Sequence, residues 1–503
     1  MSFLYRLPDI SERKPSYVID DGGQTTLCSM FSPGLAAHPG KSGVYLLPHG
    51  RDAFFARILL ARRSEKSLDI QYYMYHQDTV GKLLNYEILK AADRGVRVRM
   101  LIDDIYGNEG DAAWVALDAH PNIEVRLWNP WKRGSNRMIQ SLLRARDINF
   151  RMHSKSFTVD NQASILGGRN IGNEYFEADT EVAFSDIDVV TIGSSVPEIS
   201  SQFDTYWNNG FAYPVNILIR QGKQQDLNVL RDARSAFFKQ PSTSTYTEAL
   251  STSGLVHGLV EGRVAFSWSD ARVIHDSALK KTLGTGKAGR DESLISQLAP
   301  YIIGSKKSVD IVSPYFVPSD LATDAMCKLA QNGVEVRVLT NSLASNDVAA
   351  VHAGYSKYRR KLLRCGVQLF EMDESIKNRR GKELTWLPAL KKSSLHAKMM
   401  AFDSEYLFVG SFNFDQRSLN INNEIGLVFH DPKLAGAVAR RFEEHVNDVA
   451  FKLELTHEGG REHMRWTGGQ GGPDQVMEKE PYSTTFKKLT VSILRWLPIN
   501  SQL

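Results

Sequence analysis

The 503-residue sequence has few cysteines and no long apolar run. Its three cysteines, Cys28, Cys327 and Cys365, match neither a zinc-ligand spacing nor a disulfide framework, so they favour a reducing compartment or carry no information. No run of about 18 apolar residues occurs, so we expect no membrane-spanning helix. The first residues lack a basic stretch followed by a long apolar core, and no apolar run precedes Cys28. We therefore expect neither a signal peptide nor a lipoprotein anchor.

An excess of charge of one sign is also missing. The formal net charge is +4, from 61 Lys and Arg against 57 Asp and Glu. This mildly basic balance is weaker than that of a dedicated nucleic-acid binder, so we expect no nucleic-acid partner. The content of 42% hydrophobic and 23% charged residues is ordinary for a globular protein. The length allows two domains with cores of their own.

What the sequence does contain is one motif twice. A histidine is followed by a lysine two positions later and by an aspartate seven positions later, and each copy continues through a glycine-containing turn to an asparagine and a glutamate. The offset between the copies is 243 residues for the histidines, the asparagines and the glutamates. One such motif is a weak signal, but two at a fixed offset indicate an internal duplication. The members are His153, Lys155, Asp160, Asn170 and Glu181, and His396, Lys398, Asp403, Asn413 and Glu424.

These residue types suit a phosphate site. Residues i and i+2 of a strand share a face, so we expect the histidine and lysine of each copy to point the same way from a strand. If the two copies meet, two lysines and two asparagines can surround a phosphate monoanion with charge and neutral donors. One imidazole can then attack phosphorus while the other protonates the leaving oxygen. Glu181 and Glu424 are candidates to orient the imidazoles, as a carboxylate does in a catalytic triad.

Two other interpretations compete for these histidines. A lone histidine on an apolar strand is usually a packed core residue, but a repeated one argues against this. Histidines and carboxylates also bind metals. Two lysines would repel a divalent cation, however, so we predict a site with no metal and no cofactor. We expect Asp160 and Asp403 to brace turns rather than to touch phosphate.

The paired motifs resemble those of the phospholipase D superfamily. The wider sequence is similar to bacterial cardiolipin synthases from about residue 35 to the C-terminus, in stretches such as Leu68-Asp-Ile-Gln-Tyr-Tyr-Met, Leu166-Gly-Gly-Arg-Asn-Ile-Gly and Gly410-Ser-Phe-Asn-Phe-Asp-Gln-Arg-Ser. The resemblance implies a phosphatidyltransferase that forms a phosphatidyl-histidine intermediate. Its acceptor would be phosphatidylglycerol, and its donor phosphatidylethanolamine or phosphatidylglycerol.

The resemblance also assigns roles to residues. His153 would be the nucleophile, and His396 would first protonate the leaving oxygen and then deprotonate the acceptor hydroxyl. The lysines and asparagines of both motifs would hold the non-bridging oxygens. Ser411 would add a hydroxyl to the phosphate site, whereas the first copy has Gly168 at that position. The choice of His153 over His396 rests on the resemblance alone.

Three other functions stay open for the same residues. With water as the acceptor, the protein would be a phospholipase D hydrolase, including a secreted effector. A nuclease of the same superfamily should be more basic and should lack a lipid-seeking helix. A non-catalytic membrane scaffold is disfavoured because both motifs are complete. The need for an accessory protein partner and the oligomeric state are not decided by the sequence.

Helical and strand patterns alternate, which predicts an α/β fold. We expect two similar phospholipase D-like α/β/α halves that pack around a pseudo-two-fold axis, with one active site at their interface. The predicted segments are an irregular N-terminus (1–45), a first half (46–215), a connector (216–290), a second half (291–455) and a tail (456–503). The predicted helices are 51–63, 81–93, 112–119, 294–303, 321–330 and 348–364, and the predicted strands are 68–74, 96–102, 123–128, 309–312, 334–339 and 367–371, with one further strand carrying each motif histidine.

Two segments combine cationic and apolar residues. Residues 131–151 contain six Lys or Arg and one Asp among apolar side chains such as Met138 and Leu142, which suits an anionic lipid surface at the site entrance. The alternative is a solvated basic face over the core. Residues 485–497 have apolar residues at helical spacing with nearby lysines and predict an interfacial helix, or else a terminal helix packed on its own domain.

The same patterns lead to a location and an acceptor site. A lipid enzyme of this kind would bind phospholipid substrates and an anionic membrane surface, as a peripheral protein on the cytoplasmic face of the bacterial inner membrane. The strand that ends at 340–341 and the helix after it would select the acceptor alcohol, because α/β sheets bind ligands at strand ends. The candidates are Asn341, Asp347, His352 and Tyr355, and the alternative is simple capping and packing.

Overall fold

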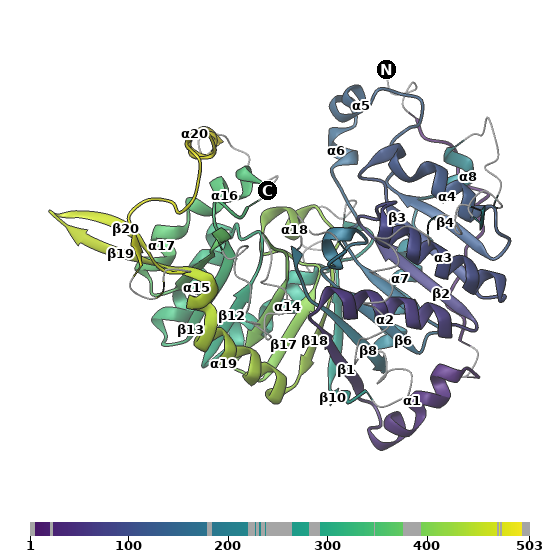
Figure 1. Cartoon of the computed structure of the whole chain (residues 1–503), viewed down its shortest axis with the longest axis horizontal. Coiled ribbons are helices and arrows are strands. Elements are labelled where there is room, and N and C mark those ends of the chain that lie inside the picture. The colour runs from purple at the N-terminus through teal and green to yellow at the C-terminus, as the bar shows by residue number, and fades with distance from the viewer. Residues whose placement is uncertain are drawn as a thin grey trace. The chain divides into compact units, whose positions relative to one another are not determined.

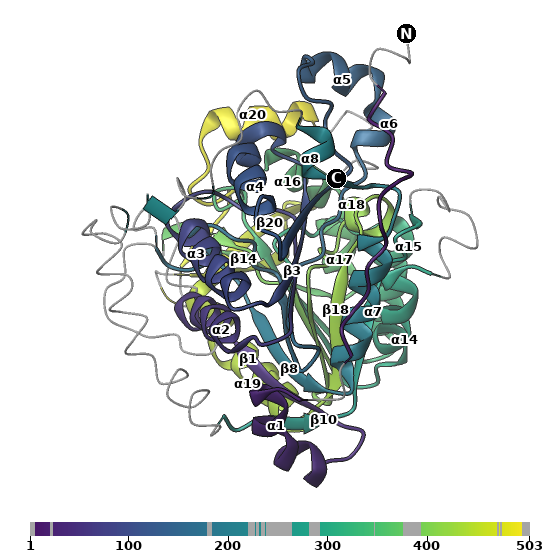
Figure 2. The same cartoon turned by 90° about the vertical axis from the view of Figure 1, so that its right-hand side faces the viewer.

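The computed structural model, drawn in Figures 1 and 2, describes residues 6–20, 24–178, 184–219, 264–280, 292–346, 348–375, 394–469 and 475–494, with the single positions 227, 231, 232, 237 and 472. The chain forms two compact units. The first comprises residues 1–180 and 188–273, and the second comprises residues 181–187 and 274–503. A short segment of the first half of the sequence therefore belongs to the second unit.

The first unit is built on a nine-stranded sheet in the order β10-β1-β8-β6-β5-β2-β3-β4-β9. Strands β2, β3 and β4 are parallel, and the pairs from β2 through β5, β6 and β8 to β1 are antiparallel. Figure 2 shows helices α2 and α3 on one side of this sheet and α7 on the other. The elements are α1 (Thr26–Ala37), β1 (Ser42–Leu47), α2 (Gly50–Arg63), β2 (Ser67–Tyr72), α3 (Thr79–Asp93), β3 (Arg97–Asp103), α4 (Asp111–Asp118), β4 (Ile123–Trp128), α5 (Arg137–Leu143), α6 (Ala145–Ile148), β5 (Ser156–Val159), β6 (Ala163–Gly167), β8 (Asp188–Gly193), α7 (Ser195–Trp207), β9 (Ala212–Pro214), α8 (Val215–Leu218) and β10 (Ser267–Ser269).

The second unit repeats this strand order. Its ten-stranded sheet runs β11-β18-β17-β16-β12-β13-β14-β19-β20-β21, with β12, β13 and β14 parallel and β16, β17 and β18 antiparallel to their neighbours. The repeated order confirms the predicted α/β class and the two similar halves. The elements are β7 (Phe184–Ser185), β11 (Ala271–His275), α14 (Leu294–Gly304), β12 (Ser308–Val312), α15 (Asp320–Gln331), β13 (Glu335–Asn341), α16 (Ala349–Ser356), α17 (Arg359–Arg364), β14 (Gln368–Met372), β15 (Ser394–Leu395), β16 (Met399–Phe402), β17 (Tyr406–Gly410), α18 (Gln416–Asn420), β18 (Ile425–His430), α19 (Pro432–Val449), β19 (Ala450–Glu458), β20 (Arg461–Gly468), β21 (Val476–Met477) and α20 (Thr485–Leu494).

The duplication extends to a buried ion pair at the centre of each sheet. In the first unit, Arg99 on β3 binds Asp69 on β2 through two contacts of 2.7 Å. In the second unit, Arg337 on β13 binds Asp310 on β12 at 2.5 and 3.0 Å. The bidentate geometry satisfies both charges where water is excluded.

Three predictions about secondary-structure elements differ from the structure. The N-terminal segment contains helix α1, whose start is capped by the Thr25 hydroxyl, and strand β1, so it is not irregular. The predicted helix 348–364 is divided into α16 and α17. The motif histidines and lysines lie just before β5 and β16 rather than inside them. Most of the predicted connector 216–290 lies outside the described residues, and the predicted domain boundaries stay predictions.

The structure contains a disulfide that the cysteine spacing does not indicate. Cys327 on α15 and Cys365, directly after α17, are bonded to each other, with their Cα atoms 5.2 Å apart. The two cysteines are 38 residues apart in the sequence, and only the packing of α15 against α17 brings them together. Cys28 is a free thiol.

Candidate active site

His396 is the motif histidine whose surroundings the structure defines most fully. Strand β15 precedes it and pairs in parallel with β7, and the backbone N–H of His396 donates to the Ser185 carbonyl at 2.7 Å. Its Nδ1 lies 2.5 Å from the Asp186 carboxylate, which is buried. A carboxylate at Nδ1 fixes the ring tautomer, directs Nε2 toward a substrate and stabilises the imidazolium. Asp186 is therefore a positioning residue for His396.

Sequence reasoning missed Asp186. At the offset of 243 residues its counterpart is Phe429, so the repeat gives no signal for it. It lies two residues before Asp188, and the pairing of β7 with β15 brings it next to His396. Glu424, one of the two carboxylates predicted for this role, accepts a hydrogen bond from Ser411 Oγ at 2.5 Å. The other, Glu181, lies outside the described residues.

Lys398 and Asn413 complete the polar surroundings of the second motif. Lys398 is fully buried, and its Nζ lies 3.0 Å from His396 Nδ1, 3.3 Å from Nε2 and 2.5 Å from the His396 carbonyl oxygen. The ammonium group thus lies against the imidazole, as the i, i+2 spacing predicts. Asn413 is buried, and its side-chain oxygen has no hydrogen-bond partner within the described chain. A buried amide without a partner costs free energy unless a ligand satisfies it.

The first motif has the same local geometry. Lys155 Nζ donates to the His153 carbonyl at 2.5 Å, as Lys398 does to His396. The ring of Tyr73 packs edge-on against the His153 imidazole, with centroids 4.8 Å apart, and Lys155 Nζ lies 5.3 Å from the same ring. Asn170 accepts from the Met74 N–H at 3.3 Å and donates to Tyr175 Oη at 2.9 Å. The aromatic contacts limit rotation of the His153 ring.

The motif aspartates act on the backbone. Asp160 accepts N–H hydrogen bonds from residues 65–67, and Asp403 accepts them from residues 306–308. Both residues have a positive φ, 52° and 54°. Burial raises the pKa of Asp160. Asp403 is less buried, and the N–H groups outweigh its burial and lower its pKa. Each aspartate thus ties the end of its motif strand to the turn before the first parallel strand.

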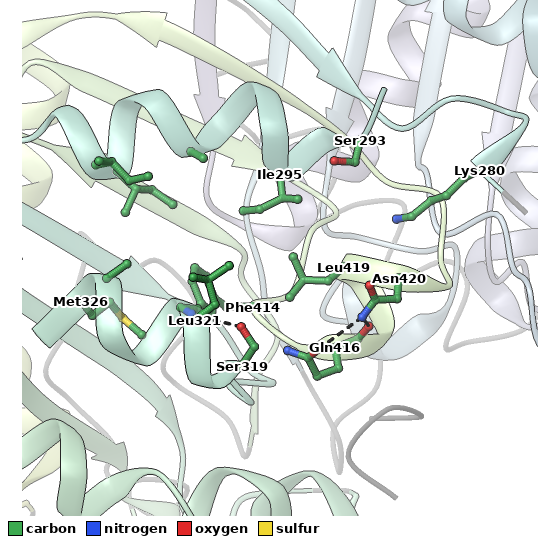
Figure 3. A pocket seen from close by; sticks show the side chains of 15 residues that line it. Lys280, Ser293, Ile295, Ser319, Leu321, Met326, Phe414, Gln416, Leu419 and Asn420 are labelled. Carbon is green, nitrogen blue, oxygen red and sulfur yellow. Dashed lines mark hydrogen bonds between the residues drawn. The ribbon is translucent and has the colours of Figure 1, made fainter. Parts of the chain in front are cut away.

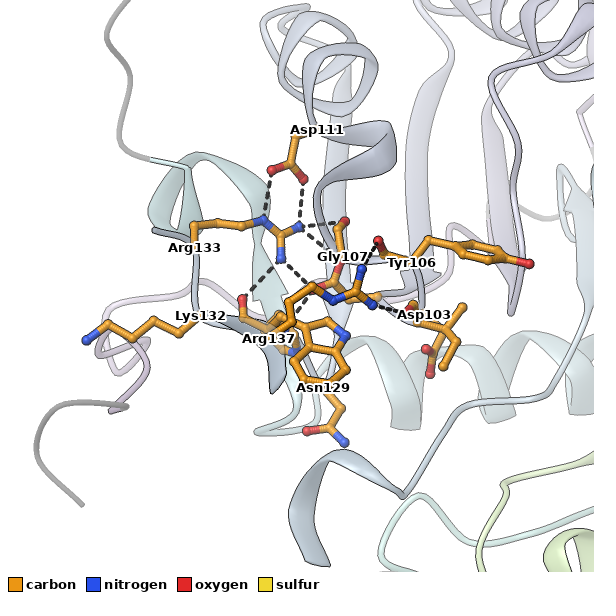
Figure 4. Close-up of polar contacts among 12 residues, drawn as sticks. Asp103, Tyr106, Gly107, Asp111, Asn129, Lys132, Arg133 and Arg137 are labelled. Carbon is orange, nitrogen blue, oxygen red and sulfur yellow. Dashed lines mark hydrogen bonds and ion pairs between the residues drawn. The ribbon is translucent and has the colours of Figure 1, made fainter. Parts of the chain in front are cut away.

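A buried carboxylate also holds the chain that leads to His153. Asp103, at the end of β3, accepts from Arg151 Nη1 at 3.1 Å and from the Met152 N–H at 2.8 Å. Burial raises the pKa of Asp103 to about 7, against the opposing effect of Arg151. The neighbouring Asp104 forms an ion pair with Arg133. Arg133 also forms an ion pair with Asp111, which Figure 4 shows. Asp103 is a second positioning residue that sequence reasoning missed, although acidic residues directly after a predicted strand are a usable signal.

The predicted acceptor site is mostly buried. Asn341 Nδ2 donates to the Leu395 carbonyl at 2.9 Å, and its oxygen accepts from the Leu395 N–H at 3.1 Å, so it braces the residue before His396. His352 lies 3.5 Å from Glu480 and is fully buried, and Tyr355 belongs to the hydrophobic core. Asp347 lies outside the described residues. These contacts give the described residues a packing role, and their part in acceptor selection stays a prediction.

An apolar pocket of about 310 Å³ opens elsewhere in the second unit. It lies between α14, α15 and α18 and is lined by residues such as Ile295, Leu321 and Leu419, with Lys280 at one side (Figure 3). Phe414 contributes to its wall directly after Asn413, but none of the motif residues lines it. This pocket is therefore not the reaction centre.

The described ranges contain neither a cluster of metal-ligating side chains nor a membrane-spanning helix. Within the described ranges, no group of three or more His, Cys, Asp or Glu side chains is placed to hold a metal ion. No helix of the part that the structure describes is long and apolar enough to cross a bilayer.

Comparison with known proteins gives the family. The family described as "Cardiolipin synthase, PLD-like domain" matches residues 58–207 and 298–446, one match in each half and more than half of the chain in total. Cardiolipin synthase C of Escherichia coli (strain K12) is 37% identical over 94% of this chain and 98% of its own length. Cardiolipin synthase A of Pseudomonas fluorescens is 25% identical over 84% of this chain and 71% of its own length.

A solved structure supports the fold. The crystal structure of phosphatidylserine synthase from Haemophilus influenzae matches with a TM-score of 0.52 at 14% identity, over 83% of this chain and 89% of that one. Together with the two copies of the His-Lys-Asp motif and the repeated strand order, these matches confirm the predicted superfamily and enzyme class. The chain therefore belongs to the cardiolipin synthase family of the phospholipase D superfamily and is a phosphatidyltransferase homologous to cardiolipin synthase C.

Proposed function

We propose that this enzyme makes cardiolipin by transferring a phosphatidyl group to phosphatidylglycerol. The observation that carries the proposal is the surroundings of His396: its Nδ1 contacts the Asp186 carboxylate, and the Lys398 ammonium group lies against its ring. The other half of the sequence repeats the same His-Lys-Asn set. The name of the relative that is 37% identical over nearly all of both chains supports this product. The two motifs act on one phosphodiester, a part of the proposal that the experiments below test.

The first half-reaction forms a covalent intermediate. His153 Nε2 attacks the phosphorus of the donor, phosphatidylethanolamine or phosphatidylglycerol, and the P–N bond forms as the P–O bond to the headgroup breaks. Protonated His396 gives its proton to the departing oxygen, so ethanolamine or glycerol leaves as a neutral alcohol. Asp186 keeps the proton of Nδ1 in place and leaves that of Nε2 for transfer. The product of this step is a phosphatidyl-histidine.

The second half-reaction reverses these roles. His396, now neutral, takes the proton of a phosphatidylglycerol hydroxyl, and the resulting oxygen attacks phosphorus while the P–N bond to His153 breaks. Cardiolipin leaves, and both histidines return to their starting protonation states. Lys155, Lys398 and the two asparagines hold the non-bridging oxygens in a buried site, where fixed donors act most strongly. No metal or cofactor takes part in this scheme.

The proposal places the enzyme at the surface of the bacterial inner membrane as a peripheral protein, because its substrates are phospholipids. The expectation of the cytoplasmic face rested on the expected lack of a signal peptide or lipoprotein anchor and on cysteines that favour a reducing compartment or carry no information. The Cys327–Cys365 disulfide instead favours an oxidising compartment. The face of the membrane is therefore not part of the proposal.

One assay tests this function directly. The purified protein is incubated with phosphatidylglycerol vesicles, with and without phosphatidylethanolamine, and the lipid products are identified by mass. We expect cardiolipin, and we expect none from His396→Ala under the same conditions. Phosphatidic acid without cardiolipin would contradict the proposal and identify a hydrolase. An absence of any turnover would contradict both enzymatic functions.

A further inference from the structure

Helix α5 exposes its apolar side chains and buries a polar one. Met138 is 75% exposed, Ile139 44%, Leu142 78% and Leu143 52%, whereas Gln140 is fully buried. At 100° per residue, the four apolar side chains share one face, and Gln140 points the opposite way. A helix on the surface of a soluble protein normally has the reverse arrangement. We therefore expect the exposed apolar face to bind a partner.

This exposure is held in place by specific contacts. The side chain of Gln140 accepts from the Lys132 N–H and donates to the Lys132 carbonyl, each at 2.9 Å. The carboxamide of Asn136 caps the first turn of the helix by accepting from the N–H groups of Met138 and Ile139. Arg137 donates to two carbonyls of the loop after β3, as Figure 4 shows. The protein thus fixes the apolar face outward.

The charges around α5 separate into two classes. Arg133 and Arg151 are neutralised by carboxylates, so only part of the basic charge in this segment is available to a partner. Arg137 is exposed, and its hydrogen bonds go to neutral carbonyls, so within the described residues no carboxylate pairs with it. Cations beside an exposed apolar face complement an anionic headgroup layer above hydrocarbon.

The location of α5 relates it to the first motif. Strands β2, β3 and β4 are parallel, and β5 is antiparallel to β2, with Ser156 opposite Gln71. His153, before β5, and α5, after β4, therefore both lie at the carboxyl edge of the sheet. Asn129 links them, because its Nδ2 donates to the carbonyls of Asp147 and Phe150 at 2.7 and 2.8 Å. The apolar face of α5 therefore belongs to the same edge of the sheet as His153.

We propose that α5 inserts Met138, Ile139, Leu142 and Leu143 into an anionic phospholipid bilayer and so holds the carboxyl edge of the first sheet against the membrane. The choice of a bilayer as the partner rests on the proposed function, because the substrates of that reaction are phospholipids. Insertion removes four large apolar side chains from water and leaves Arg137 at the depth of the phosphates.

The first experiment measures vesicle binding without turnover. Full-length protein is sedimented with vesicles of phosphatidylglycerol and phosphatidylcholine, as wild type and as Met138→Asp/Leu142→Asp. The matched control is Leu321→Asp, a helical leucine of the second unit that is 81% exposed. We expect the double variant to bind roughly tenfold or more weakly, because each inserted side chain leaves water, and the control to bind like wild type. Equal binding of the double variant, or an equal loss in the control, would overturn the proposal.

A second measurement is independent of variant stability. A fluorophore that senses polarity is attached to Leu142→Cys, and in parallel to Leu321→Cys, both in a Cys28→Ser background. Adding vesicles should shift the emission of the first label to shorter wavelength and leave the second unchanged. No shift at position 142 would reject insertion, as expected if α5 instead binds a protein. Because neither readout needs turnover, α5-dependent binding by a wild type that makes no cardiolipin would refute the proposed function and leave this inference standing.

Discussion

At the scale of single residues, the proposed chemistry depends on both motif histidines. We expect His153→Ala and His396→Ala each to lower the rate of cardiolipin formation by roughly 10³-fold or more, because each removes either the nucleophile or the proton carrier. Product formation per minute on phosphatidylglycerol vesicles measures this. The control variant is Ala163→Gly, which is purified in the same way. Ala163 begins β6, and the glycine-containing turn of the motif follows the other end of that strand. Substantial activity in either histidine variant would remove that residue from the mechanism.

Asp186 gives a sharper prediction, because only its contact with His396 implies a role in the reaction. Asp186→Asn should lower kcat on the order of 10²–10⁴-fold and change KM little, since the amide no longer fixes the tautomer. The limb of the rate–pH profile that His396 sets should move to lower pH, because the carboxylate no longer stabilises the protonated ring. Asp186→Glu should restore part of the rate. An unchanged pH profile in Asp186→Asn would show that the residue has only a structural role.

Asp415 offers a test of stability against pH. This buried residue caps α18, and burial raises its pKa from 3.8 to about 6, with a smaller contribution from Glu424. Its folded-state pKa lies above the unfolded value, so its contribution to stability is lost as pH rises from about 4 to about 6. Asp415→Asn keeps a good cap without a titration. The free energy of unfolding of the variant relative to wild type should therefore rise by on the order of 2–3 kcal/mol between pH 4 and pH 7. A difference that stays constant over this range would contradict the prediction.

At the scale of elements, α20 fits both interpretations of its sequence, an interfacial helix and a terminal helix packed on its own domain. Val491 packs with Leu343 and Ala353 of the second unit, and Lys487 Nζ donates to the Ala344 carbonyl at 3.0 Å. Leu489 and Ile493 are exposed. The described part of α20 is therefore packed on its own domain along one face and open along the other. The side chain of Phe486 and residues 495–503 lie outside the described residues.

This division separates lipid binding from stability. Leu489→Ser/Ile493→Ser should weaken sedimentation with anionic vesicles and leave activity on detergent-dispersed lipid intact, because only exposed side chains change. Val491→Ala should instead lower the free energy of unfolding by roughly 1–2 kcal/mol, since it removes buried methyl groups. Deletion of residues 485–503 should combine both effects. Unchanged sedimentation of the serine variant would reject α20 as a membrane contact.

At the scale of the whole molecule, the duplication provides two lysine ammonium groups. In the proposed scheme they do the work that a metal cation does in a metalloenzyme. Each half brings one buried lysine to its histidine, Lys155 and Lys398. In the proposed reaction scheme both ammonium groups bind one phosphate, and two such groups stabilise the anion directly and disfavour a divalent ion. We therefore expect full activity after dialysis against EDTA, measured as cardiolipin formed in chelator-treated buffer. Loss of activity that added Mg²⁺ or Ca²⁺ restores would contradict the metal-free scheme.

The sequence by itself determined the duplication, the alternation of helices and strands along the chain and the motif residues. Repeated spacing and alternating periodicity are local properties of the chain, so the sequence alone shows them. Local pattern also predicted that Asp160 and Asp403 would brace turns, which is where the structure places their carboxylates.

Only the tertiary structure decided which distant groups meet. Asp186 reaches His396 across 210 residues, Cys365 reaches Cys327 through helix packing, and Gln140 is buried while Leu142 is exposed. No local pattern encodes such contacts, because they depend on how the strands and helices pack rather than on spacing along the chain. Residues 137–143 were not among the predicted helices, and the face of α5 that turns toward water is set by the hydrogen bonds of Gln140 to the backbone of Lys132.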